Sequence, residues 1–185
     1  MIDTGTITTV VNGTRTFLDQ RAAWKAGRAP RSMPILYIEV LKQCNLRCIM
    51  CGYPTDYPTR GKRLDTEQLK TILRDSLELD CKVVSFGGGE PFLRKDIETL
   101  IDYCGELGLS LHINSNGTRF DDESTGRLAG ADHLHLAFSL DHCIPALNDS
   151  IRGAGVFESV RTSVAGFRKL APAVELTLNC VVGAH

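Results

Sequence analysis

The feature that most constrains the fold is an alternation, from Ile35 onwards, between apolar runs of strand length and segments with helical spacing. The strand-length runs lie at residues 35–40, 82–86, 109–113, 133–140 and 174–182. Apolar positions at three- and four-residue spacing mark helices at 69–77, behind the capping signal "DTEQ", and at 97–104 and 160–167, with a weaker short helix at 121–129. Because strands that alternate with helices build parallel sheets, we predict an α/β fold with five parallel strands.

Two features flank this alternation. Residues 1–34 form a short preface, with a hairpin turn at 11–14 and a helix at 18–27 whose Trp24 is expected to anchor it to the core domain at 35–185. The last strand ends at "CVVGAH" with no helix after it, so its apolar edge is expected to lie open. We therefore interpret the chain as the front part of a longer protein, or as one whose edge a partner covers.

Composition narrows the class of function. With 43% hydrophobic and 23% charged residues, the chain can bury one substantial core. Its 21 lysines and arginines against 22 acids give a net charge of -1, which provides no electrostatic reason to expect nucleic acid or an anionic membrane as partner. The N-terminus lacks the basic start and apolar run of a signal peptide, so we expect a cytoplasmic protein. In that reducing compartment, seven cysteines favour metal ligation over disulfides.

Three of these cysteines stand close together in "CNLRCIMC", at Cys44, Cys48 and Cys51. Thiolates bind zinc or iron-sulfur clusters, and three of them in the spacing C-x3-C-x2-C can hold three corners of a 4Fe-4S cluster. One iron would then be open to a substrate or cofactor, as in catalytic metal sites. The alternatives are a zinc site completed by a distant histidine, or buried thiols that bind nothing.

Unusual loops follow the first four predicted strands at their carboxyl ends. They are the cysteine triplet, "GGGEP" at 87–91, "NSNGT" at 114–118 and "SLDH" at 139–142. Because parallel α/β folds place their sites at the carboxyl ends of the strands, we expect these loops to face one cavity.

Together, "CNLRCIMC", "GGGEP", "NSNGT" and "SLDH" with the following "SIRGAGVFESV" resemble the core of a radical S-adenosylmethionine (radical SAM) enzyme over residues 35–182. The resemblance implies a partial (β/α)6 barrel of the TIM type, of which five βα units are visible here and the C-terminal end is missing. It also implies an oxygen-sensitive 4Fe-4S cluster that binds S-adenosylmethionine through its open iron, and a reductant such as flavodoxin or ferredoxin.

The same resemblance assigns residues to the cofactors. The cluster ligands are Cys44, Cys48 and Cys51, and the candidates for contact with S-adenosylmethionine are Met50, Gly88, Gly89, Glu90, Asn116, Ser139, Asp141, Arg152 and Asn179. Among these, Glu90 and the two glycines would meet the methionine amino group. Arg152 would pair with a carboxylate through its bidentate guanidinium. The family usually has an aromatic residue where this chain has Met50, whose thioether can pack on the adenine instead.

Other residues have more than one interpretation each. His112 should lie on the same strand face as Asn114, where it either meets a substrate or is a hydrogen-bonded core residue. Cys143 is a hydrogen donor, a second-cluster ligand or an ordinary loop thiol. The basic run "RGKR" at 60–63 is a solvated face or an anion site. His133, His135 and His142 flank the fourth strand, the first two on one predicted face, without a carboxylate nearby to complete a metal site.

The sequence thus predicts a radical SAM enzyme that cleaves S-adenosylmethionine reductively and abstracts hydrogen from a substrate. Because the preface is too short for a separate peptide-recognition domain, we expect a small molecule of cofactor or natural-product biosynthesis as substrate. The alternatives are a peptide or protein maturase with auxiliary clusters beyond residue 185, and a non-catalytic iron-sulfur or zinc module. No membrane partner is expected, and the sequence gives no oligomeric state.

Overall fold

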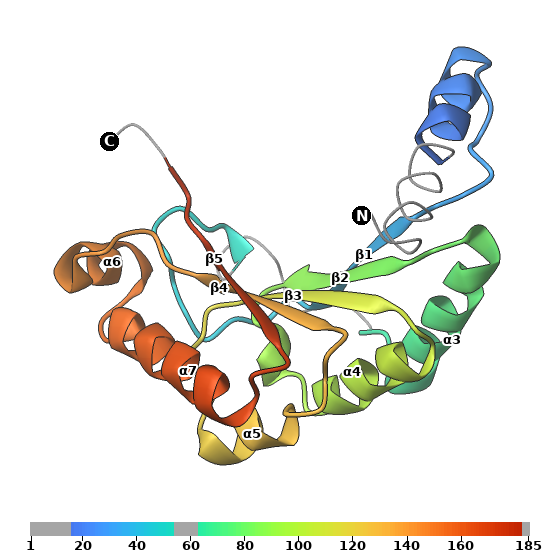
Figure 1. Cartoon of the computed structure of the whole chain (residues 1–185). Helices are drawn as coiled ribbons and strands as arrows, with labels where there is room; N and C mark the ends of the chain where they lie inside the picture. Colours follow the sequence, from blue (N-terminus) through green and yellow to red (C-terminus); the bar gives the residue numbers. More distant parts are fainter. Residues whose placement is uncertain (1–15, 54–62, 183–185) are drawn as a thin grey trace, which may run out of the picture.

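The computed structural model describes residues 16–53 and 63–182, which fold into one parallel sheet with helices packed on one of its faces (Figure 1). The strands are β1 (Ile35–Leu41), β2 (Val83–Gly88), β3 (Ser110–Ser115), β4 (Leu134–Ser139) and β5 (Glu175–Asn179). All neighbouring pairs are parallel, and the strands lie side by side in chain order. The prediction of five parallel strands at these positions is therefore confirmed.

Helices connect the strands and cover one face of the sheet, and we call the opposite face the open face (Figure 1). They are α3 (Thr66–Ser76), η1 (Leu77–Leu79), η2 (Pro91–Leu93), α4 (Ile97–Glu106), α5 (Asp122–Arg127), α6 (Pro145–Arg152) and α7 (Val156–Leu170). Helix α3 begins as the "DTEQ" signal predicts, because the Asp65 side chain accepts from the backbone N–H of Gln68 while the Gln68 side chain accepts from that of Asp65. The short helix α5 begins with a similar reciprocal cap between Asp121 and Ser124.

The core lies between the sheet and these helices. Side chains alternate along each inner strand, so Leu134, Leu136 and Phe138 of β4 are buried while the residues between them are half-buried. Phe138 packs edge-on against Phe120, and Phe120 against Phe167 of α7, with ring centroids 5.6 and 5.0 Å apart. The apolar residues marked by the strand and helix periods thus pack together in one layer between the sheet and the helices.

Helix α6 was not predicted. Its sequence, "PALNDSIR", has few apolar residues and begins with a proline, which is favourable at the first helical position. The helix keeps its place through polar contacts instead. Asn148 is buried and accepts from the backbone N–H of Asp141, in the loop after β4.

The N-terminal helix stands apart from the sheet (Figure 1). Residues 16–25 are helical, close to the predicted range, but Trp24 is 86% exposed, so the prediction that it anchors the helix to the core is wrong. The helix is tied to its own linker, because Asp19 accepts from the Arg28 guanidinium and from the backbone N–H of Arg31. The hairpin predicted at 11–14 lies outside the described residues.

Strand β5 forms one end of the described sheet, as predicted, and β1 forms the other. Leu178 of β5 is 56% exposed, and the following Val181 and Val182 are also exposed. Among the residues that the structure describes, no helix has the length and apolar character needed to cross a bilayer.

Candidate active site

The loops after β1 and β2 are joined by their backbones. The N–H of Gly89 donates to the carbonyl of Leu41 at 2.7 Å, and the N–H of Glu90 donates to that of Gln43 at 2.9 Å, one residue before Cys44. The approach requires glycine, because a Cβ on Gly89 would overlap the Gln43 carbonyl, and Gly88 has a φ of 113°. The "GGGEP" loop therefore supports the start of the cysteine loop.

Cys44, Cys48 and Cys51 are all half-buried in that loop. Burial raises the pKa of the Cys48 thiol, the Arg152 guanidinium counteracts this, and the neighbouring Cys44 and Cys51 raise the pKa further. The three thiols are not arranged around one point, since residues 16–53 and 63–182 contain no group of three His, Cys, Asp or Glu side chains arranged to hold a metal ion. The chemistry of the loop nevertheless fits a cluster, because three thiols stand on one short segment.

Glu90 is directed into the protein. Its side chain accepts from the backbone N–H groups of Phe92 (3.1 Å) and Asn116 (2.7 Å) and from the Ser115 hydroxyl (2.9 Å), and the residue is 1% exposed. Burial raises the pKa of the carboxyl, while these bonds oppose the rise. The structure thus gives Glu90 a role in joining the ends of β2 and β3, and the predicted contact with a methionine amino group stays a prediction.

Asn116 lies behind the first cysteine. Its Nδ2 lies 3.8 Å from the Cys44 sulfur and donates to Oδ1 of Asn45 at 2.9 Å, while Nδ2 of Asn45 donates to the Thr118 hydroxyl at 2.8 Å. Sequence reasoning placed Asn116 at S-adenosylmethionine and missed Asn45 and Thr118. No local signal could have found them, because the partners lie 71 and 73 residues apart in the sequence, in loops after β1 and β3, with β2 between these strands.

Asp141 and Arg152 pair with each other. The guanidinium Nη2 donates to one carboxylate oxygen at 2.9 Å, and Nε lies 2.7 Å from the other without the alignment of a hydrogen bond. The two side chains are 2% and 9% exposed, respectively. Burial acts to raise the pKa of Asp141, but the bonds from Arg152 and from the N–H of Val181 outweigh it and lower the pKa.

The same arginine adjoins the cysteine loop. The backbone carbonyl of Arg152 accepts from the Cys48 thiol at 3.8 Å, and that of Ile151 accepts from the N–H of Ile49 at 2.9 Å. The C-terminus of α6 therefore supports this loop at Cys48 and Ile49. The structure pairs Arg152 with Asp141, where the sequence predicted a partner carboxylate on the cofactor.

The remaining candidates lie on or near the open face. Ser139 and Asn179 are register partners at the ends of β4 and β5, and Asn179 donates to the amide oxygen of Asn114 at 2.9 Å, across the small side chain of Ala137. Met50 is exposed beside Cys51. These side chains are available for contact with a cofactor, and no contact in the structure assigns them further.

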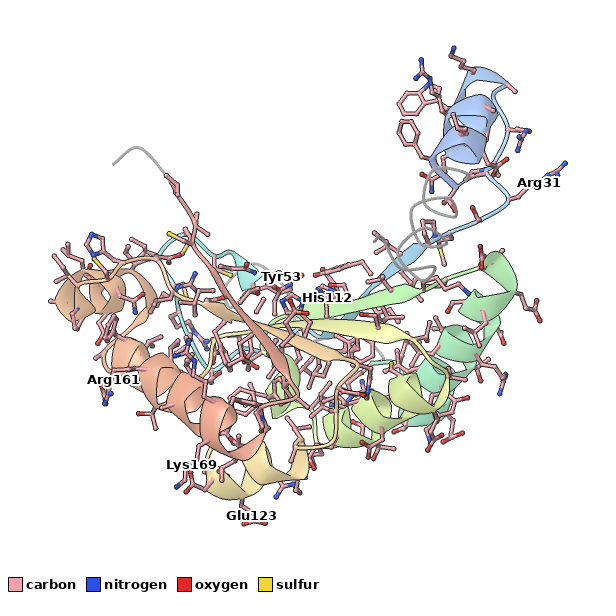
Figure 2. The ribbon with its side chains drawn as sticks, viewed as in Figure 1. Arg31, Tyr53, His112, Glu123, Arg161 and Lys169 are labelled. Atoms are coloured by element: carbon pink, nitrogen blue, oxygen red, sulfur yellow. The ribbon has the colours of Figure 1, made fainter. Side chains whose placement is uncertain are left out.

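A row of polar side chains crosses the open face below these residues. Strand register aligns Tyr37, Ser85, His112, His135 and Glu175. His112 projects from the face away from the helices (Figure 2), on the side of Asn114 as predicted. Its ring centroid lies 4.4 Å from that of His135, and burial first, then His135, lower the pKa of His112.

His133 and His135 lie on opposite sides of the sheet. His133 precedes the strand and its ring nitrogen lies 2.9 Å from the carbonyl of Ile101 in α4, on the helix side, whereas His135 contacts Thr177 on the open face at 3.1 Å. The prediction that they share one face is wrong because the strand begins only at Leu134. Cys143 is exposed, and its nearest polar contact is His142 at 4.0 Å. Of "RGKR", only Arg63 lies within the described residues.

Comparison with known proteins decides the family. Residues 38–183 match the Radical SAM superfamily. The chain belongs to this superfamily. Its CxxxCxxC motif, at Cys44, Cys48 and Cys51, is consistent with the match, and membership means that the protein is an enzyme that uses a 4Fe-4S cluster and S-adenosylmethionine.

Three curated relatives illustrate what the chain is similar to. Mycofactocin maturase MftC of Mycobacterium tuberculosis is 34% identical over 75% of this chain and 37% of its own length. Fe-coproporphyrin III synthase of Methanosarcina barkeri is 32% identical (68% of this chain, 32% of the relative), and PqqA peptide cyclase of Bradyrhizobium diazoefficiens is 28% identical (78% and 38%). The chain therefore spans about a third of the length of these relatives.

One similar solved structure is Streptococcus suis SuiB bound to S-adenosylmethionine. It has a TM-score of 0.75 at 19% identity and covers 100% of this chain, which itself covers 41% of SuiB. The five parallel strands and their helices thus form the partial barrel of radical SAM enzymes, as predicted.

Proposed function

We propose that this chain is the radical SAM barrel of an enzyme that modifies a peptide. The observation that carries the proposal is its similarity, over three quarters of its length, to a mycofactocin maturase and to a PqqA peptide cyclase. This favours the peptide alternative over the small-molecule substrate predicted from the short preface. The length of the preface does not indicate the substrate, because most of the length of the relatives has no counterpart in this chain.

We assign the cluster to Cys44, Cys48 and Cys51. When bound, the cluster supplies the single electron that splits S-adenosylmethionine and releases a radical able to remove hydrogen from a substrate. The chain's own residues then position the cofactors. The backbones of Gly88 and Gly89 stand next to the cysteine loop and are available to a methionine amino group.

The open face of the sheet suits a peptide. Its polar row offers hydroxyl, imidazole and carboxylate groups, and the amides of Asn114 and Asn179 lie nearer the cysteine loop, where Ser139 and Met50 are also available to the cofactor. A face that is at least partly exposed across five strands can accommodate an extended chain, whose backbone needs hydrogen-bond partners.

Anaerobic reconstitution tests the cluster assignment. The protein that contains this chain should bind iron and sulfide and, with dithionite and S-adenosylmethionine, release 5'-deoxyadenosine, whereas Cys48→Ala should bind less iron and release none. Cys143→Ala is the matched control and should behave as the wild type, because Cys143 is exposed outside the triplet. Unchanged iron content and turnover in Cys48→Ala would show that the assignment is wrong.

The substrate class needs a separate assay. Candidate precursor peptides should increase 5'-deoxyadenosine release and undergo a change of mass, measured by mass spectrometry. A tetrapyrrole is the second candidate, since an Fe-coproporphyrin III synthase is also similar to the chain. Conversion of iron coproporphyrin, with no peptide turned over, would replace the peptide proposal by this one.

A further inference from the structure

The loops that meet at the first cysteine carry an excess of positive charge. Residues 42–51, 89–95 and 116–120 together contain one carboxylate, Glu90, which is buried. The same three segments carry four exposed cations, which we call the cationic rim: Lys42, Arg47, Lys95 and Arg119. In a chain with a net charge of -1, this is a local concentration of one sign of charge.

The rim is joined to Cys44 by short contacts. The Arg47 guanidinium donates to the backbone carbonyl of Cys44 at 3.2 Å. Arg119 follows Thr118, whose hydroxyl accepts from Asn45, the residue after Cys44, at 2.8 Å. A molecule bound at the rim would therefore sit directly against the loop that carries the cysteines.

Part of the rim lies on the helix side of the sheet. Lys95 and Arg119 line a groove of about 500 Å³ together with residues of α4 and α5, the helices that cover the face opposite His112. Acidic groups of the groove are already engaged: Glu98 and Glu123 bind Arg127, and Asp121 caps α5. This part of the rim, at Lys95 and Arg119, thus faces away from the polar row that we assign to a substrate.

We propose that the cationic rim is the docking surface for an acidic one-electron carrier protein that reduces the cluster. The proposal rests on ligation of the cluster by Cys44, Cys48 and Cys51. Radical SAM enzymes need a reductant, and the transfer is simple: one electron leaves the carrier, which is oxidised, and enters the cluster, which is reduced, with no bond made or broken. Complementary charge accelerates such encounters and makes them sensitive to salt.

The test uses reduced flavodoxin as the acidic carrier and follows bleaching of the cluster by stopped flow. Lys95→Glu combined with Arg119→Glu should lower the second-order rate constant about tenfold at low ionic strength, and should remove most of its salt dependence. Reduction by dithionite, and the resulting 5'-deoxyadenosine, should remain at the wild-type level. Lys95→Arg with Arg119→Lys should keep the wild-type rate, because both charges remain.

Arg21→Glu with Lys25→Glu is the matched control. It makes the same change of charge on the exposed helix at 16–25, which stands away from the cysteine loop, and should leave the rate with flavodoxin unchanged (Figure 1). Equal rates for the rim variant and this control would overturn the proposal. So would an unchanged flavodoxin rate with a raised KM for a peptide, which would assign the rim to the substrate. If wild-type protein with dithionite releases no 5'-deoxyadenosine, the cluster assignment itself has failed.

Discussion

At the scale of the residue, the most consequential pair is Asp141 with Arg152. Replacing Arg152 by Met leaves a buried carboxylate without its cation, so the free energy of unfolding should fall by about 3–5 kcal/mol in denaturant titrations. Arg161→Met is the control and should change it little, because its pair with Glu158 is exposed. A small loss in Arg152→Met would mean that Asp141 is well solvated.

The same pair predicts a pH dependence. Because the pKa of Asp141 is lowered in the folded protein, its stabilising contribution is fully present above the ordinary value of 3.8 and is lost as pH falls through the lower folded pKa. The difference in stability between wild type and Arg152→Met should therefore shrink below about pH 3.8. A difference that stays constant in acid would contradict a charged pair.

Gly89 gives a second prediction at this scale. In Gly89→Ala the new methyl group would overlap the Gln43 carbonyl and push the two loops apart, so stability should fall by about 1–3 kcal/mol and iron content after reconstitution should decrease. Gly126→Ala is the matched control. A Cβ there meets nothing within 4 Å, so this variant should be at least as stable as wild type. Equal behaviour of both variants would show that the loops have room to separate.

At the scale of the element, α7 is attached to the sheet by aromatic packing. Phe167 is fully buried against Phe120 and Phe138, and its replacement by alanine should cost about 3–5 kcal/mol of unfolding free energy. Phe17→Ala, on the exposed N-terminal helix, should cost far less. Similar losses in calorimetry or denaturant titrations would show that the N-terminal helix is packed in solution.

At the scale of the whole molecule, the order of the strands predicts the order of local opening. Strand β3 is paired on both sides, whereas β5 is paired only with β4 among the described residues. Amide hydrogen exchange followed by mass spectrometry should therefore be slower at Leu111 and Ile113 than at Thr177 and Leu178. Equal protection of β5 would indicate that another segment or a partner pairs with its free edge.

Most of the elements, and the cofactors, could be predicted from the sequence alone. Strand and helix periods depend on neighbours two to four residues away, so the five strands and the cap of α3 could be read directly, and the cysteine spacing is likewise local. Helix α6 was not predicted because it is held by a polar contact, from Asp141 to Asn148, and not by an apolar stripe.

The hydrogen-bond and packing partners of individual side chains, in contrast, could be seen only in the folded structure. Glu90 meets Asn116 from 26 residues away, and Arg152 meets Asp141 across a loop and a helix, so neither choice leaves a periodic trace in the sequence. The same holds for His133, which lies against α4, and for Trp24, which is exposed on its helix. Local spacing fixes which backbone forms, whereas the direction of a polar side chain depends on which distant groups folding brings within hydrogen-bond distance.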